Sequence, residues 1–295
     1  MGILEQIAQS YESLSKSHKA IADYILESYD KAQYLTANKL AAVTGVSEAT
    51  VVRFTTEIGF TGYPAFQQAL KEELKSKLTS VQRLDYTDRF QDDSQAVNDV
   101  MKTDIDNVKE TLANIDHKKM NEAVETILGA RKIYIMGIRS SATLSEFMHF
   151  YMTVLFDDVV QVRSNCTNEL FEQVMPITED DVLIGISFPR YSARTINSMA
   201  YAHKRGAKTI AITDRDKTPM TEHADISLFA TSSMASFVDS LTAPLSLINA
   251  LLVTLGMHRK DHIKSSFESL ETLWSQYKVY EIGRDRKDND DFPAP

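Results

Sequence analysis

Residues 35 to 66 constrain the fold more than any other stretch, because capping signals and apolar spacing there define two short helices and the turn between them. Thr36 is suited to cap the first helix, in which Leu40 and Val43 are expected to face inward. Gly45 supplies the left-handed residue that ends this helix. A second capping signal follows directly, so the stretch predicts a helix-turn-helix.

The second helix, which Ser47 caps, has one packed face and one free face. Val51, Phe54 and Ile58 recur at spacings of three and four, which is typical of a face buried in a core. Such helix pairs can seat the free face of their second helix in the major groove of DNA, but they also occur in all-α domains that never touch DNA. Both interpretations stay open at this point. The free face carries Glu48, Ala49, Thr50, Arg53 and Glu57.

Charge does not decide between these interpretations, because the first 80 residues hold 8 Lys or Arg against 9 Asp or Glu. A nucleic-acid footprint usually shows a basic excess. Any DNA contacts must therefore be local, from a few side chains and from the free amides at the start of the second helix. The candidate DNA-binding residues are Lys39, Ser47, Glu48, Thr50 and Arg53.

The run VSEATVVRFTTEIGFTGYPAF, residues 46 to 66, resembles the signature of the RpiR family of bacterial transcription regulators. In that family Val-Val-Arg-Phe lies on the recognition helix, and Gly-Phe-x-Gly-Tyr-x-x-Phe follows it. The resemblance covers residues 1 to 78 and implies double-stranded operator DNA as a partner and a sugar isomerase (SIS) domain downstream. The matching residues here are Val51, Val52, Arg53, Phe54, Gly59, Phe60, Gly62, Tyr63 and Phe66.

The composition is that of a globular protein, with 43% apolar and 25% charged residues, a net charge of −9 and room for two domains in 295 residues. Cys166 is the only cysteine, which excludes an internal disulfide and a cysteine-rich zinc site. We interpret it as a small core residue. The amino terminus lacks the basic and apolar regions of a signal peptide. We expect a cytoplasmic protein with no metal and no cofactor.

Residues 240 to 257 carry no charged side chain over about the length of a membrane span. Pro244, Asn249 and several hydroxyls interrupt this run, which favours a helix buried against a sheet or a partner subunit. We therefore expect no membrane partner. The stripe predicted to be buried consists of Leu241, Leu245, Ile248 and Leu252.

From residue 131 the pattern changes to short, β-branched apolar runs that alternate with helical segments. Nearly continuous apolar strands of this kind indicate a parallel sheet covered on both faces. The fold class is therefore two domains, an all-α helix-turn-helix domain followed by an α/β domain with a five-stranded parallel sheet flanked by helices. The five strands are expected at residues 132–136, 159–163, 181–187, 208–213 and 225–229.

Three loops at the carboxyl ends of these strands, at residues 137–141, 187–192 and 213–214, are candidates for holding an anion. In open α/β sheets, ligands bind where such a loop enters a helix and leaves its first amides free. Hydroxyls and amides at neighbouring loops would wrap a phosphate without a metal, which favours a phosphorylated small molecule. Serines that only cap helices are the competing interpretation.

Residues 98 to 280 resemble the SIS domain that the first resemblance implies. In the pattern Gly-x-Gly-x-Ser, Gly137 and Ser141 match, but Arg139 replaces the second glycine. In the pattern Ser-x-Ser-Gly-x-Thr, Ser187 matches, Pro189 and Arg190 replace Ser-Gly, and Ser192 replaces Thr. The resemblance implies that the serines hold a sugar phosphate. The candidate effector-binding residues are Arg139, Ser140, Ser141, Ser187, Arg190, Ser192 and Thr213.

The two arginines have more than one interpretation. They either fill the pocket or add guanidinium groups suited to an acidic or doubly charged sugar phosphate. A third possibility is that Arg139 and Arg190 point to solvent or pair with Glu169 or Asp214.

The resemblance implies a transcriptional regulator of carbohydrate metabolism whose operator affinity is controlled by a bound phosphosugar. The first alternative is a sugar-phosphate isomerase or lyase of the same fold, which would need a general base near the sugar. No spacing marks such a base, and we expect no catalytic residue. The second alternative is a sugar-phosphate sensor that acts through protein partners. The acid–base groups near the loops are Glu146, Glu169, Glu172 and His223.

The expected division of the chain is residues 1–78 for the DNA-binding domain, 79–97 for a linker, 98–280 for the SIS domain and 281–295 for a disordered tail. Val100, Ile105, Val108 and Leu112 predict a helix after the linker. A homodimer or higher homo-oligomer is expected, since symmetric assemblies are common and would pair two DNA-binding domains. The helices at 240–257 and 268–280 are the candidate dimer surfaces.

Overall fold

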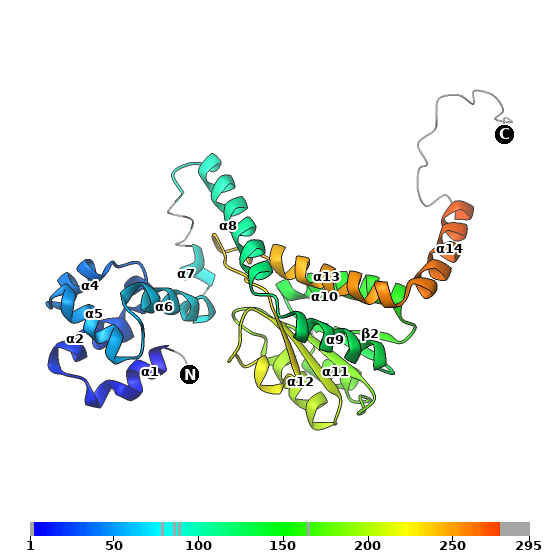
Figure 1. Ribbon diagram of the computed structural model, residues 1–295, viewed down its shortest axis with the longest axis horizontal. Helices are drawn as coiled ribbons and strands as arrows, with labels where there is room; N and C mark the ends of the chain where they lie inside the picture. The colour runs from blue at the N-terminus through cyan, green and yellow to red at the C-terminus, as the bar shows by residue number, and fades with distance from the viewer. Residues whose placement is uncertain (1–2, 78–79, 85–86, 88–89, 164–165, 278–295) are drawn as a thin grey trace.

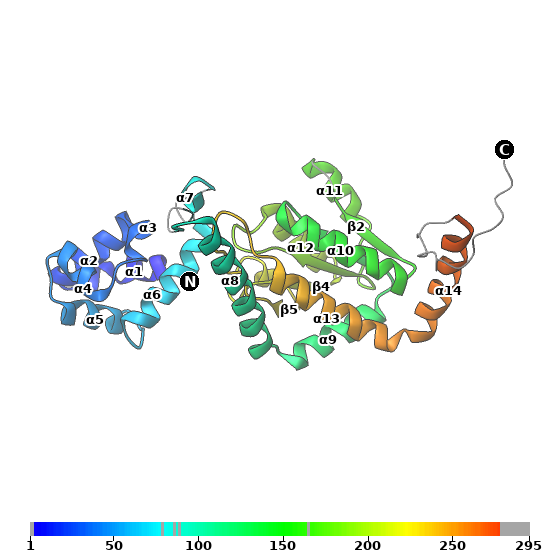
Figure 2. The same cartoon turned by 90° about the horizontal axis from the view of Figure 1, so that it is seen from above.

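The computed structural model describes residues 3–77, 80–84, 87, 90–163 and 166–277. Figure 1 shows a small helical part at the amino terminus and a larger part in which helices surround a sheet. In Figure 2, turned by 90°, the two parts still lie side by side along the long axis. This arrangement confirms the predicted fold class of a helix-turn-helix domain followed by an α/β domain.

The amino-terminal part packs short helices around one apolar core. Phe54 and Phe66 meet at its centre, with ring centroids 6.1 Å apart in an edge-on contact, and both side chains are fully buried. The elements are α1 (Ile3–Ser10), η1 (Tyr11–Ser13), α2 (Lys16–Glu27), α3 (Tyr29–Ala32), α4 (Ala37–Thr44), α5 (Glu48–Glu57) and α6 (Tyr63–Lys77).

The helix-turn-helix forms as its capping residues predict. Thr36 accepts a hydrogen bond from the Lys39 amide, and Ser47 accepts one from the Thr50 amide. Gly45 ends α4 with φ 69°, in the left-handed region. The prediction that Val43 faces inward is wrong, because its side chain is 53% exposed. Leu40 is buried as expected, and its neighbour Ala41 takes the second inward position.

The turn between α5 and α6 explains the residues after the recognition helix. Gly59 and Gly62 adopt φ values of 93° and 153°, which side chains other than glycine rarely adopt. The turn brings the Tyr63 hydroxyl to the Leu35 carbonyl, to which it donates a 2.7 Å hydrogen bond. Burial raises the pKa of Tyr63 to about 12, so the phenol keeps this proton. The bond ties α6 to the start of the helix-turn-helix.

The segment expected to be a linker, residues 79–97, contains the short helix α7 (Ser80–Leu84) and the start of α8 (Asp93–Ala113). Asn107 on α8 is buried and donates to the Ser233 carbonyl at 2.8 Å, so α8 is fixed to the α/β part. The predicted apolar stripe on this helix is largely exposed, at 49% for Ile105 and 71% for Leu112.

All five predicted strands are present and parallel, in the order β2-β1-β3-β4-β5. The chain enters the sheet at β1, the second strand in this order, places β2 at the edge beside it and then crosses to the other side for β3. The register pairs Ile133 with Val159 on one neighbour and with Val182 on the other. The strands are β1 (Ile133–Gly137), β2 (Val159–Val162), β3 (Val182–Ile186), β4 (Lys208–Thr213) and β5 (Ile226–Phe229).

Helices cover both faces of the sheet. One apolar core lies between the sheet and α9 (His117–Gly129), α10 (Ser140–Leu155) and α13 (Thr242–His258). The core on the other face involves α11 (Thr167–Val174) and α12 (Ala193–Lys204). The short turn η3 (Thr221–His223) precedes β5, and α14 (Lys260–Tyr277) follows α13.

Helix α13 is the charge-free stretch of the sequence. Ile248 and Leu252 are buried as predicted, whereas Leu245 is 37% exposed and belongs to the outer face. No described helix combines the length and apolar character needed to cross a membrane. The expectation that Cys166 is a core residue is wrong, because this side chain is exposed. The tail predicted at 281–295 lies outside the described residues.

Candidate functional site

The exposed face of α5 carries a connected row of polar side chains. The hydroxyls of Ser47 and Thr50 lie 2.8 Å apart. Arg53 donates from Nη2 to the Thr50 hydroxyl at 3.3 Å and from Nε to the Ala49 carbonyl. On the opposite face, Val51 and Phe54 are fully buried. These buried side chains therefore anchor α5 to the core, and the row of polar side chains points away from the domain.

The other two candidates for DNA contact lie beside this row. Glu48 accepts a 3.3 Å hydrogen bond from the Asn38 amide group, which links α5 to α4. Lys39 is exposed on α4, on the first helix of the pair. The structure thus gathers Ser47, Thr50 and Arg53 into one row, and it links Glu48 to α4, the helix on which Lys39 is exposed.

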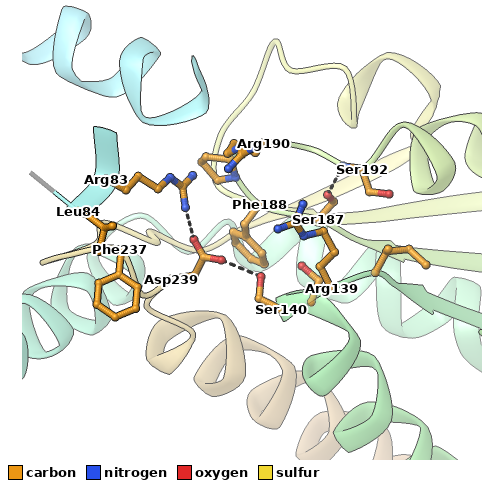
Figure 3. Close-up of a pocket in the computed structure, with 13 residues that line it drawn as sticks. Arg83, Leu84, Arg139, Ser140, Ser187, Phe188, Arg190, Ser192, Phe237 and Asp239 are labelled. Carbon is orange, nitrogen blue, oxygen red and sulfur yellow. Dashed lines mark hydrogen bonds and ion pairs between the residues drawn. The ribbon is translucent and has the colours of Figure 1, made fainter. Parts of the chain in front are cut away.

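The α/β part has a cavity of about 380 Å³ at the carboxyl ends of β1 and β3. These two strands are where the strand order reverses, and ligands of open α/β sheets bind at this kind of position. Side chains from both strand-end loops surround the cavity (Figure 3). It is lined by Arg83, Leu84, Ile138, Arg139, Ser140, Ser141, Ser187, Phe188, Pro189, Arg190, Ser192, Phe237 and Asp239.

The loop after β1 depends on one glycine and one strained arginine. A Cβ on Gly137 would lie 2.8 Å from the carbonyl carbon of Ser141, so only glycine lets β1 approach α10 this closely. Arg139 has φ 60° and ψ −126°, a conformation that favours glycine. Its guanidinium makes no hydrogen bond or ion pair recorded among the described residues, and its side chain is exposed at the cavity. Ser140 and Ser141 begin α10.

The loop after β3 is closed by its own serines. The Ser192 amide donates to the Ser187 hydroxyl at 3.0 Å, and the Ser192 hydroxyl accepts from the Thr195 amide at 3.4 Å. Both hydroxyls therefore serve the local structure, as the capping interpretation predicts, while they also line the cavity. Arg190 sits between them with φ 70°, a second arginine in a conformation that favours glycine.

A partly buried hydrogen bond holds this loop in place. The Tyr191 hydroxyl donates to Oδ1 of Asp214 at 2.8 Å. Burial and then the neighbouring carboxylate raise the pKa of Tyr191, so the phenol is protonated and donates. Burial also raises the pKa of Asp214, although the hydrogen bond from Tyr191 and the charge of Arg215 act in the opposite direction. The bond fixes the backbone on both sides of Tyr191.

Thr213 is the candidate that the structure does not bring to the cavity. Its side chain is fully buried, and its hydroxyl lies 3.3 Å from Oδ1 of Asp214. The loop after β4, residues 213–214, therefore contacts the loop after β3 through Asp214 and does not line the cavity. Arg139, Ser140, Ser141, Ser187, Arg190 and Ser192 all line the cavity.

Sequence reasoning missed Arg83 and Asp239. Arg83 reaches the cavity from α7, and its Nη1 lies 2.7 Å from Oδ1 of Asp239. The Ser140 hydroxyl donates to the other oxygen of Asp239 at 2.8 Å. One signal was available for Asp239, which is the only Asp, Glu, Lys or Arg between Asp225 and Arg259. Arg83 lies in a segment without clear periodicity and gave no signal.

The acid–base candidates for an isomerase do not gather at the cavity. None of Glu146, Glu169, Glu172 and His223 is among its lining residues. Glu146 instead pairs with Arg163, at 3.4 Å on the surface. The described residues also contain no cluster of groups that could hold a metal ion.

Comparison with known proteins decides the family. Residues 1–77 match the helix-turn-helix domain of the rpiR family, and residues 126–254 match the SIS domain. A protein of Haemophilus influenzae described as an uncharacterized HTH-type transcriptional regulator is 35% identical over 227 residues, which cover 76% of this chain and 77% of that one. This chain belongs to the RpiR family of transcriptional regulators. It is a regulator rather than an enzyme.

Other known proteins align with most or part of this chain. The regulator HexR of Escherichia coli is 26% identical, with 97% of this chain and all of that protein covered. Among solved structures, the Vibrio vulnificus NanR protein complexed with ManNAc-6P has a TM-score of 0.58 at 22% identity, covering 93% of this chain and 99% of that one. The sugar isomerase domain of an RpiR transcription factor from Sphaerobacter thermophilus gives 0.56 at 24% identity, covering 59% and 96%. These structures share the fold.

Proposed function

We propose that this regulator binds operator DNA through α5, and that a phosphosugar bound in the cavity between β1 and β3 controls its operator affinity, in the service of carbohydrate metabolism. The observation that carries the proposal is the cavity itself. Three arginines from three segments, Arg83, Arg139 and Arg190, converge on it with four serines. A cavity of this kind suits an anion that also carries hydroxyl groups.

The chemistry of the lining favours a phosphate ester over other anions. A phosphate monoester carries a charge near −2 at neutral pH and offers several strong acceptor oxygens. Guanidinium groups and the first amides of α10 and α12 are suitable donors for such oxygens. The volume of about 380 Å³ is within the usual range of small-molecule sites. The NanR protein, which has the same fold, was solved with ManNAc-6P bound.

On the DNA side, the proposed contacts are Ser47, Thr50 and Arg53, with Lys39 and Glu48 at the edge. The proposed parts are residues 1–78 as the DNA-binding domain, 79–97 as a connector and 98–280 as the effector domain. Two copies are needed in this proposal, because a domain without a basic excess binds DNA weakly by itself. A two-fold dimer would read half-sites about one helical turn apart or a multiple of it.

Control of DNA affinity requires the phosphosugar to bind two arrangements of the dimer unequally. A coupling free energy of about 1–3 kcal/mol is typical, which changes operator affinity about 5- to 150-fold. The same factor must appear in reverse, so operator DNA changes phosphosugar affinity equally.

The test is operator binding with and without candidate effectors. The DNA region upstream of the protein's own operon is titrated in a gel shift, alone and with a panel of sugar phosphates that includes N-acetylmannosamine 6-phosphate. A phosphosugar is expected to change affinity at least about fivefold, and at 100 times its Kd to add about 2.7 kcal/mol to the free energy of unfolding. The same sugars without phosphate are the control. A panel with no effect on either quantity would overturn the proposal.

Arg139→Gly is expected to move stability and effector affinity in opposite directions. Relief of the strained backbone at φ 60° is worth about 1–3 kcal/mol, partly offset by the flexibility that glycine adds to the unfolded chain. The SIS domain should therefore melt a few degrees higher. Loss of the guanidinium should weaken the binding of inorganic phosphate and of the effector about tenfold, as for a charge-assisted hydrogen bond.

Lys217→Gly is the matched control for this prediction. Lys217 is exposed, has φ 56° and is not among the cavity-lining residues. Relief of a positive φ is expected to raise stability there as well, with unchanged anion affinity. Calorimetry for melting and titration for binding separate the two quantities. If Arg139→Gly binds phosphate as tightly as Lys217→Gly, Arg139 makes no contact with the anion.

A further inference from the structure

Arg83 is a buried cation on the connector, and its side chain lines the effector cavity. Its side chain is only 7% exposed, and it comes from α7, between the DNA-binding part and the SIS domain. A buried guanidinium is stable only when an anion or several acceptors compensate its charge. Asp239 supplies that anion at 2.7 Å, from the loop before α13 (Figure 3). The two residues are 156 positions apart in the sequence.

The second carboxylate oxygen of Asp239 accepts a hydrogen bond from another donor at the cavity. Ser140 donates its hydroxyl proton to Oδ2 of Asp239 at 2.8 Å. Ser140 is the first residue of α10, where the free amides of the helix lie. A single carboxylate thus satisfies a guanidinium and a hydroxyl at the helix start, which are the two kinds of donor that a phosphate group would use.

A carboxylate is also the wrong charge for an anion-binding cavity. Among the described residues that line it, Asp239 is the one acid, facing the arginines at positions 83, 139 and 190. A phosphate dianion that enters is repelled by this carboxylate. It competes for Arg83 and Ser140 with twice the charge.

We propose that Asp239 holds the place of the effector's phosphate group, and that phosphate binding transfers Arg83 from Asp239 to the ligand. The inference rests on the proposed function, in which the cavity takes a phosphorylated molecule. Its consequence is regulatory. The ligand then contacts α7 directly through Arg83. The segment that leads to the DNA-binding domain therefore exchanges its contact with Asp239 for a contact with the ligand when the cavity fills. This gives the differential contact that allosteric control requires.

Substitutions of the two partners of the ion pair are expected to change the affinity for phosphate in opposite directions. Arg83→Ala removes a ligand contact and should lower the affinity for inorganic phosphate about tenfold, as expected for one charge-assisted hydrogen bond. Asp239→Asn keeps the shape, removes the competing charge and should raise phosphate affinity about tenfold. A purely structural ion pair gives the same sign in both variants, because each leaves the other member of the pair, the buried Arg83 or the half-buried Asp239, without its counter-charge.

Isothermal titration of the full-length protein with inorganic phosphate at low ionic strength measures these affinities. Arg163→Ala is the matched control, since it removes a surface arginine that pairs with Glu146 at 3.4 Å outside the cavity. Its phosphate affinity should stay within about twofold of the parent protein, as for an exposed pair. Melting curves of every variant verify folding. Equal or lower affinity in Asp239→Asn overturns the proposal.

Hydrogen exchange then reports where the ligand acts. Phosphate should slow exchange in residues 137–145, which is the binding itself, and in residues 80–84, which is the transfer of Arg83. The second effect should vanish in Arg83→Ala. Protection of 137–145 without any change in 80–84 refutes the transfer but leaves the proposed function intact. Absence of protection in both segments refutes the phosphate site and the transfer that rests on it.

Discussion

Replacing Arg53 by alanine is expected to lower operator affinity about 100-fold, because the loss would occur once in each half of the proposed dimer. An arginine that contacts a base edge contributes about 1–3 kcal/mol, and about 1.4 kcal/mol lost twice corresponds to a factor of 100. The bonds from Arg53 to the Thr50 hydroxyl and the Ala49 carbonyl hold the guanidinium over the exposed face of α5 before DNA arrives. Fluorescence anisotropy with the operator measures the loss.

Lys19→Ala is the matched control for Arg53→Ala. Lys19 is a cation on α2 of the same domain, and its ammonium lies 3.7 Å from Glu12. Removing it changes the domain charge equally, and the loss of operator affinity should stay below about threefold, as for a screened long-range charge. Equal losses in the two variants would mean that α5 does not read the operator. Arg53→Lys should retain non-specific DNA affinity and lose preference for the operator, since lysine lacks the guanidinium fork.

The helix-turn-helix was predictable because its signals are local. Each cap acts within three residues, and Gly45 acts through its own backbone. Val43 shows where local reasoning fails. The buried face of α4 is centred between Leu40 and Ala41, which leaves Val43 about 110° away around the helix at 100° per residue. Small residues such as alanine can occupy the closest contact, so Ala41 is buried here while the larger Val43 is exposed.

The cavity was predictable to the level of its loops. Parallel strands bring their carboxyl ends to one edge, and the strand order places the ends of β1 and β3 together. The arginines at positions 139 and 190 depart from a glycine pattern in the sequence, and both backbones have a positive φ. Arginine therefore stands at these two positions although the backbone has the positive φ that favours glycine.

The pair of Arg83 and Asp239 was not predictable, because it depends on how the connector folds back onto the SIS domain. Neither residue belongs to a periodic face, and the contact spans 156 positions. Contacts of this kind depend on the whole fold. They are also contacts through which a ligand in one domain can affect another domain.

Gly137→Ala is expected to be the most damaging single change in the SIS domain. The new Cβ would lie 2.8 Å from the Ser141 carbonyl carbon and 3.1 Å from the Ser145 Cβ. Both obstacles belong to α10, which is packed against the sheet and α13, so they cannot move aside singly. Overpacking against fixed backbone should cost at least about 3 kcal/mol in the free energy of unfolding. Where the protein still folds, Ser140 and Ser141 shift and phosphate binding is lost.

Alanine substitutions at two other glycines provide a graded comparison, because the atoms that the new Cβ would meet differ. In Gly185→Ala the new atom would lie 2.9 Å from Cγ of Met199, a flexible side chain that can rotate away, so a loss of only about 1–2 kcal/mol is expected. In Gly129→Ala nothing lies within 4 Å, and alanine should add up to about 1 kcal/mol at this helical position. Chemical denaturation of the three variants measures the series. If Gly137→Ala is no more damaging than Gly185→Ala, then α10 yields to the new methyl group, and the close approach of β1 to α10 does not hold the serines at the start of that helix in place.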